Sequence, residues 1–170
     1  MNPVNAVAVP ADSDIARHLR GAHFFDAYEA ALPDGRLSAL EIYLSVVSRT
    51  PGWVERLMST RNRVVGWFGL KNLGSLGAID RAKPASAYRI GDRVGIFTIH
   101  SLSEREVVFA DSDRHLDAKI SVCKTGSAER PAAAVSTVVH IHNLLGHVYI
   151  FFVGPVHKLI VPAMLRRLPA

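Results

Sequence analysis

The chain has 170 residues, of which 49% are hydrophobic and 21% are charged. This length suits one domain that buries roughly 70% of its unfolded surface, and the composition excludes a disordered or fibrous chain. The net charge of +5 is spread along the chain, which argues against a nucleic-acid-binding protein, and the single cysteine excludes an intramolecular disulfide and a Cys-rich zinc site.

The first 22 residues show no periodicity and contain two prolines, so we predict an extended lead-in over residues 1–22. This segment has neither a basic start nor a long apolar run, and we therefore expect no cleaved leader and a cytoplasmic protein.

A strand and two helices are predicted next. Phe24–Ala30 alternates weakly and indicates a strand. Ser38 followed by Glu41 predicts a helix that opens with a capping box. Thr50 and Pro51 predict a second helix, with Thr50 as its cap and Pro51 at its first position. The apolar positions assigned to this second helix are Trp53, Val54, Leu57, Met58, Val64, Val65, Trp67 and Phe68.

From residue 88 onward the period changes to two, which is typical of strands joined by short turns. A long C-terminal helix follows over residues 146–168, with Asn143 as a candidate cap. The predicted strands of this meander cover residues 93–100, 106–110, 115–124 and 134–143.

This order of elements predicts an α+β fold, in which a curved antiparallel sheet grips the long C-terminal helix. Two helices lie between the first and second predicted strands, and residues 23–170 form a single domain. A curved sheet around one helix commonly encloses a cavity, which is the default ligand site.

The apolar segment 144–165 is also long enough to cross a bilayer. It contains Lys158, His147 and His157, which are costly in hydrocarbon, so we favour a helix packed on the sheet. Peripheral membrane contact through Tyr149, Phe151 and Phe152 is kept as an alternative.

Four sequence blocks, taken together, resemble the bacterial domain of unknown function 2867 over about residues 23–168. The blocks begin at Thr50-Pro51-Gly52-Trp53, Gly91-Asp92-Arg93-Val94, Asp113-Arg114-His115-Leu116-Asp117 and Thr137-Val138-Val139-His140-Ile141-His142.

That family resembles the START/polyketide-cyclase (SRPBCC) helix-grip superfamily, so the resemblance implies the same fold as the order of elements. It supplies no catalytic residues. The third block departs from the usual His-Leu-Asp-Phe-Arg of the family, because Ala118 and Lys119 replace the aromatic residue and the arginine. A role that needs a planar guanidinium is therefore not expected there.

The candidate polar groups are His115, Asp117, His140 and His142. Strand alternation places His115 with Asp117, and His140 with His142, on common faces. Three imidazoles and a carboxylate suit a divalent metal ion. We favour instead a polar patch within the sheet, or groups that hold the polar end of a ligand, and expect no metal and no cofactor.

The main hypothesis is a binding module for a small hydrophobic or amphipathic molecule. The expected apolar walls are Phe97, Ile99, Phe109, Ile120, Val139 and Tyr149. The alternative from another class is a cyclase- or hydratase-like enzyme that uses a His/Asp pair in the same cavity. Cys123 is not expected to be a nucleophile, because no base is spaced to activate it.

Overall fold

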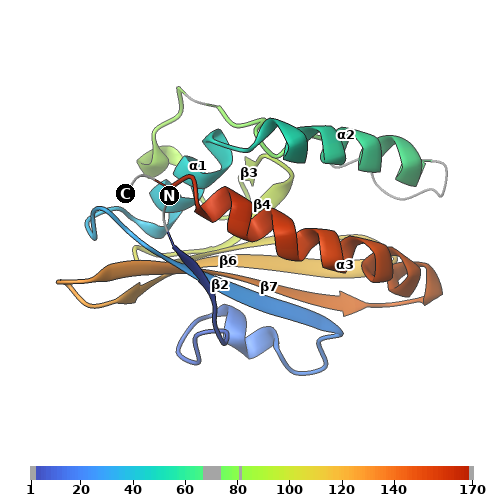
Figure 1. Ribbon diagram of the computed structural model, residues 1–170, viewed down its shortest axis with the longest axis horizontal. Coiled ribbons are helices and arrows are strands. Elements are labelled where there is room, and N and C mark those ends of the chain that lie inside the picture. The colour runs from blue at the N-terminus through green and yellow to red at the C-terminus, as the bar shows by residue number, and fades with distance from the viewer. Residues whose placement is uncertain (1–2, 67–73, 81, 169–170) are drawn as a thin grey trace.

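The computed structural model describes residues 3–66, 74–80 and 82–168. Three α-helices cover one face of an antiparallel sheet, and the N-terminal segment crosses the other face (Figure 1). The predicted α+β, helix-grip-like architecture is confirmed.

The sheet has seven strands in the order β1-β2-β7-β6-β5-β4-β3. From β3 onward the strands follow one another as a meander, and β2 pairs with the last strand. The strands are β1 (Val4–Ala6), β2 (Phe24–Ala31), β3 (Arg93–Val94), β4 (Phe97–Leu102), β5 (Glu106–Ser112), β6 (Leu116–Gly126) and β7 (Pro131–Ile141).

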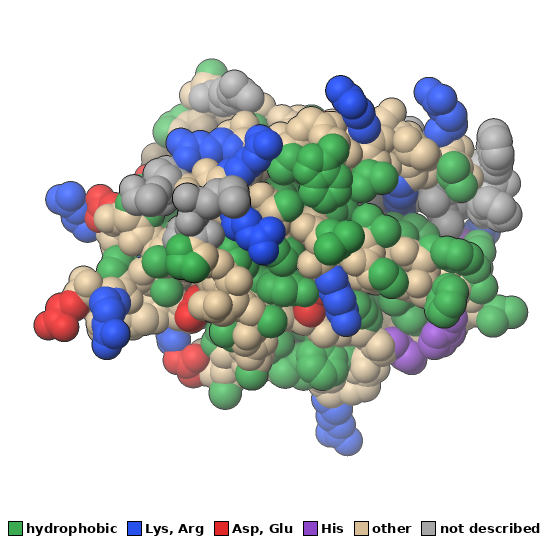
Figure 2. Space-filling view, viewed as in Figure 1, with side chains coloured by type: hydrophobic (Ala, Val, Ile, Leu, Met, Phe, Trp, Pro, Cys, Tyr) green, Lys and Arg blue, Asp and Glu red, His purple; other side chains and the backbone are tan. Residues whose placement is uncertain are grey.

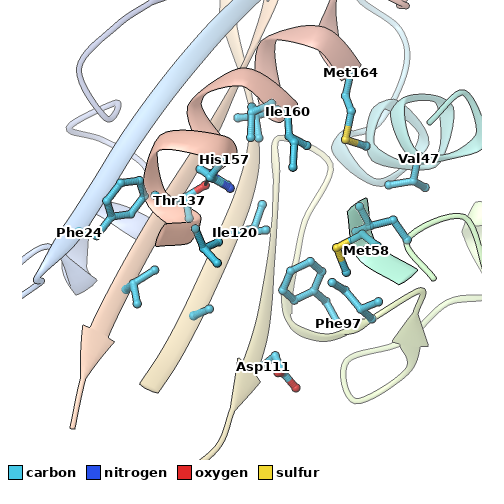
Figure 3. Close-up of a pocket in the computed structure, with 18 of the residues that line it drawn as sticks. Phe24, Val47, Met58, Phe97, Asp111, Ile120, Thr137, His157, Ile160 and Met164 are labelled. Carbon is cyan, nitrogen blue, oxygen red and sulfur yellow. Dashed lines mark hydrogen bonds between the residues drawn. The ribbon is translucent and has the colours of Figure 1, made fainter. Parts of the chain in front are cut away.

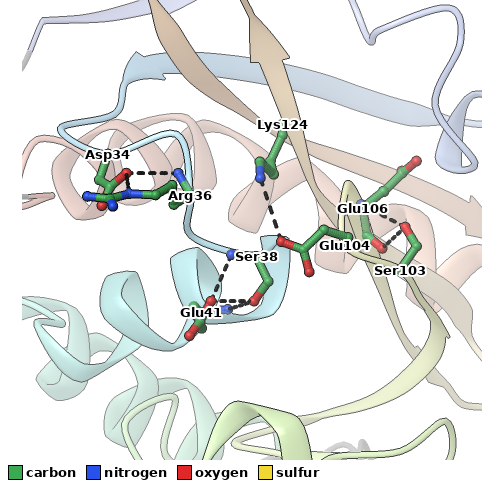
Figure 4. A network of polar contacts seen from close by, with 8 residues as sticks. All are labelled: Asp34, Arg36, Ser38, Glu41, Ser103, Glu104, Glu106 and Lys124. Carbon is green, nitrogen blue, oxygen red and sulfur yellow. Dashed lines mark hydrogen bonds and ion pairs between the residues drawn. The ribbon is translucent and has the colours of Figure 1, made fainter. Parts of the chain in front are cut away.

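Local capping determines where two of the helices begin. The helices are α1 (Ala39–Ser48), α2 (Gly52–Gly66) and α3 (Leu144–Leu165). In the predicted capping box, the Glu41 amide donates to Ser38 Oγ at 3.3 Å and the Ser38 amide donates to the Glu41 carboxylate at 2.8 Å (Figure 4). Asn143 caps α3 as predicted, because its Oδ1 accepts from the Gly146 amide at 3.1 Å.

The start of α2 differs from the prediction. The Thr50 hydroxyl donates to the Val47 carbonyl at 2.6 Å, so it satisfies the end of α1 and does not cap α2. Trp67 and Phe68, which we assigned to the second helix, lie outside the described residues.

The lead-in is more ordered than an extended segment. Residues Val4–Ala6 form β1 at the sheet edge, and a 3-10 turn, η1 (Ile15–His18), packs on the face opposite the helices. Ile15 is fully buried there against Val108 and Val138. Apolar side chains on both faces of the sheet require cover on both faces, and the lead-in supplies the second.

Candidate functional site

A cavity of about 220 Å³ lies between the sheet and α3, with α1 and α2 closing its side. Strand alternation directs every second side chain of β6 and β7 toward it, and most of these side chains are apolar. Its apolar lining includes Phe24, Val47, Met58, Phe97, Leu116, Ala118, Ile120, Val122, Val135, Val139, Ile150, Val153, Ile160, Val161 and Met164 (Figure 3). The walls are therefore mainly hydrocarbon, with polar groups at few points.

One pair of polar side chains in the cavity lining lies where α3 crosses the sheet. His157 extends from α3 toward β7, and its Nε2 lies 3.0 Å from Thr137 Oγ1 (Figure 3). Both side chains line the cavity. Together they offer a hydroxyl and an imidazole that can donate or accept hydrogen bonds.

A buried carboxylate stands behind this pair. Asp26 of β2 is in register with Thr137, and its Oδ1 lies 3.4 Å from His157 Nε2. The side chain of Asp26 is only 9% exposed, and within the described residues neither carboxylate oxygen has a hydrogen-bond partner. A buried carboxylate is costly without a partner, so the imidazole is positioned to compensate it when it carries a proton.

A second polar point joins α2 to α3. Arg61 Nε donates to Tyr149 Oη at 3.1 Å, and the guanidinium carbon lies 5.3 Å from the centre of the Tyr149 ring. Both residues line the cavity, as do the carboxylates of Asp111, near the end of β5, and of Asp113, in the turn that follows it. The Asp113 carboxylate already accepts from two backbone amides, at 2.6 and 3.0 Å, and so serves the β5–β6 turn.

The candidate residues from the sequence divide between the cavity and other places. Phe97 and Tyr149 line the cavity. His115 is 6% exposed and packs at the start of α3, where its Nδ1 lies 3.2 Å from Asn143 Oδ1. It belongs to the cap region of the helix and is not among the residues lining the cavity.

Asp117 and His140 are register partners on strands β6 and β7 and point to the opposite face of the sheet. Asp117 Oδ2 lies 3.1 Å from His142 Nε2, and His140 Nε2 lies 3.2 Å from the Arg20 carbonyl. Burial acts to raise the pKa of Asp117, but hydrogen bonds from Ser112 and His142 outweigh it and lower this pKa. These three groups therefore form a surface cluster outside the cavity.

The expected apolar walls are also divided. Ile120 and Val139 line the cavity, whereas Ile99 and Phe109 are buried in the neighbouring core. Phe109 packs against Tyr43 of α1, with ring centroids 4.0 Å apart. Ile99 and Phe109 therefore belong to the packed hydrophobic core beside the cavity and do not line it.

Cys123 lies on the face covered by the lead-in and is 1% exposed. Burial, followed by the nearby Glu106 carboxylate, raises the pKa of its thiol to about 11. The thiolate, which is the reactive form, is therefore scarce near neutral pH. Within the described part of the chain, no three His, Cys, Asp or Glu side chains gather as a metal site would require.

Sequence reasoning missed Asp26, Arg61 and Thr137 as site residues and treated His157 only as a helical histidine. The alternation in β6 was an available signal, since Leu116, Ala118, Ile120 and Val122 share the apolar face and exclude Asp117 from it. Asp26, whose carboxylate lies beside His157, belongs to a strand more than a hundred residues earlier in the chain. Only the pairing of β2 with β7 brings Asp26 next to Thr137 and His157.

The length of α3 is also notable. Among the described residues it is the helix long and apolar enough to cross a membrane by length and composition, with a mean hydropathy of 1.7. In the structure its inner side is buried, with Gly154 close to Phe24 of β2 and Leu165 in the hydrophobic core.

Comparison with known proteins gives one match. The family described as "Protein of unknown function (DUF2867)" matches residues 18–164, which covers most of the chain and confirms the predicted resemblance. No curated protein and no solved structure matches this chain.

Proposed function

Because the chain belongs to the DUF2867 family, whose description gives no activity, we propose a function from the site: the protein binds a small hydrophobic or amphipathic ligand in the cavity under α3. The observation that carries this proposal is the apolar cavity itself. Small-molecule sites are usually concave and mainly apolar, with few polar groups, and this cavity of about 220 Å³ has that form.

The volume restricts the size of the ligand. An apolar cavity of about 150 Å³ accommodates benzene, so about 220 Å³ accommodates roughly nine non-hydrogen atoms. A single substituted ring or a medium-length acyl chain has this size.

The polar points indicate how such a molecule is oriented. Its apolar part lies against Ile120, Val139 and Ile160, and a hydroxyl or carboxyl group reaches His157 and Thr137. Few polar groups in an apolar pocket are the usual source of orientation and specificity.

A cavity-filling substitution tests the proposal. The Ala118→Leu variant adds three carbons to the inner face of the sheet, whereas Ala110→Leu adds the same group to the opposite face and is the matched control. We expect p-cresol, phenylacetate or octanoate to raise the melting temperature of the wild type and of Ala110→Leu, but not of Ala118→Leu.

Equal responses of the three proteins would contradict the assignment of the ligand to this cavity. The assignment would also be contradicted if no compound raised the melting temperature and benzene left the methyl NMR resonances of Ile120 unchanged.

The enzyme alternative has one specific observation in its favour, the His157–Asp26 contact at 3.4 Å on the cavity side of the sheet. A carboxylate close to an imidazole is a common arrangement in proton transfer. In this alternative, His157 removes a proton from a carbon next to a carbonyl group and returns a proton from solvent to the same carbon.

Cyclohexanone in deuterated water tests this step by NMR. The alternative predicts deuterium incorporation by the wild type at a rate above buffer, and its loss in His157→Gln. Incorporation no faster than in buffer would exclude this proton transfer for a ketone that fits the cavity.

A further inference from the structure

The outer side of α3 is apolar although it faces solvent. Six of its residues fall within about 100° of one another around the helix, at 100° per residue. The large side chains among them are highly exposed: Leu144 78%, Phe151 74%, Phe152 69% and Leu159 67%. The six residues are Leu144, Val148, Phe151, Phe152, Pro155 and Leu159. A surface helix normally presents polar residues at these positions.

Helix α2 extends this apolar surface. Trp53, Leu57 and Val64 fall within about 40° of one another around α2, and their exposed fractions are 42%, 39% and 43%. The two helices lie beside each other on the same side of the sheet (Figure 1), and hydrophobic side chains gather over them in the space-filling view (Figure 2). We call these exposed residues of both helices the α2–α3 face.

Cations border the α2–α3 face. Arg56 and Arg63 lie on α2 beside the apolar stripe, Lys158 lies beside the stripe of α3, and Arg166 and Arg167 follow the end of α3; all five are exposed. Figure 2 shows Lys and Arg side chains around the hydrophobic ones. Residues 130–170 contain neither Asp nor Glu.

The one carboxylate of α2 is engaged elsewhere. Glu55 accepts from Ser75 Oγ at 2.7 Å and from the Gly77 amide at 3.0 Å, so it holds the following loop. The border of the α2–α3 face is therefore cationic, and no acidic side chain of α2 or α3 is available to neutralise it.

We propose that the α2–α3 face docks on the surface of an anionic lipid bilayer. Aromatic and aliphatic side chains would enter the boundary between headgroups and acyl chains, while the bordering cations pair with lipid phosphates. Helix α3 lies on the bilayer and does not cross it, because its inner side is part of the core under the sheet.

The charge pattern favours a bilayer over a second copy of the chain. A two-fold dimer through this face would bring two cation-bordered surfaces together, with no acidic side chain of α2 or α3 to pair with the cations. An anionic bilayer supplies the opposite charge along the whole face. The proposal does not depend on ligand binding in the cavity, since the docking residues point away from it.

Vesicle flotation tests the proposal on the full chain. Vesicles are made of phosphatidylcholine alone, or of phosphatidylcholine mixed with phosphatidylglycerol, at low and high salt. We expect the wild type to bind the anionic vesicles and to bind less at high salt, because salt screens exposed charges.

Two substitutions separate the apolar and electrostatic contributions. The double variant Phe151→Ser, Phe152→Ser is expected to weaken binding by at least about tenfold, because two exposed phenyl groups no longer enter the lipid. Arg63→Gln with Lys158→Gln is expected to remove the preference for anionic vesicles. Ile90→Ser is the control, since Ile90 is 65% exposed in the loop before β3, outside the α2–α3 face.

Absence of flotation with both kinds of vesicle would overturn the proposal. So would equal loss of binding in Ile90→Ser and in the double phenylalanine variant. A wild-type dimer in sedimentation equilibrium that the phenylalanine variant dissociates, without vesicle binding, would show that a second copy covers the face instead.

Discussion

At the scale of single residues, Glu106 joins two distant parts of the chain. It is 5% exposed, and its carboxylate accepts from the amides of Asp14 and Ile15, at 2.5 and 3.2 Å, and from Ser121 Oγ at 2.6 Å. The carboxylate thus satisfies the free amides at the start of η1, as a capping side chain would, although it belongs to β5. A side chain of the sheet thereby fixes the lead-in.

We predict that Glu106→Gln lowers the free energy of unfolding by about 2–3 kcal/mol. The reason is that the backbone amides of Asp14 and Ile15 lose a charged acceptor at a buried site. Glu104→Gln is the neighbouring control. Glu104 is 74% exposed and its carboxylate lies 3.8 Å from Lys124 Nζ (Figure 4), a long contact at the surface worth less than about 1 kcal/mol. Urea denaturation measures both, and equal losses would contradict the role given to Glu106.

At the scale of elements, η1 carries a titratable contact to the sheet. The rings of His18 and His100 meet edge to face, with centroids 6.0 Å apart. Burial, and then electrostatic interactions with Lys119, His100 and His140, lower the pKa of His18. The folded state, in which the lead-in is packed on the sheet, therefore favours the neutral form of His18.

This shift predicts a loss of stability in mild acid. As pH falls, the unfolded chain binds a proton at His18 first, near pH 6.5, and the folded chain binds it only at lower pH. The contribution of His18 is present above about pH 6.5 and is lost as pH falls through its folded pKa. We expect the free energy of unfolding to fall less between neutral and mildly acid pH in His18→Gln than in the wild type. Parallel pH profiles of the two proteins would contradict this account.

At the scale of the whole molecule, the sequence predicted what depends on local patterns. The capping box at Ser38, the cap at Asn143 and the meander of strands followed from residues close in sequence. The lead-in could not be predicted, because β1 has three residues and its pairing depends on β2.

The polar part of the site depends on long-range register. His157 meets Thr137 only because α3 returns over β7, and Asp26 joins them only because β2 pairs with β7 at that position. Sequence spacing instead favoured His140 and His142, whose pattern is conspicuous but whose side chains do not line the cavity. Of the six candidate site residues, Phe97 and Tyr149 line the cavity.

Ligand binding under α3 is the central claim, and intermolecular NOE measurements with methyl-labelled protein test it most directly. With bound octanoate, we predict contacts to methyl groups of Ile120, Val139 and Ile160, which line the cavity, and none to Val108 or Val138, which lie under the lead-in. Contacts confined to Val148 and Leu159 on the outer side of α3, or no contacts at all, would contradict a binding site between the sheet and the helix.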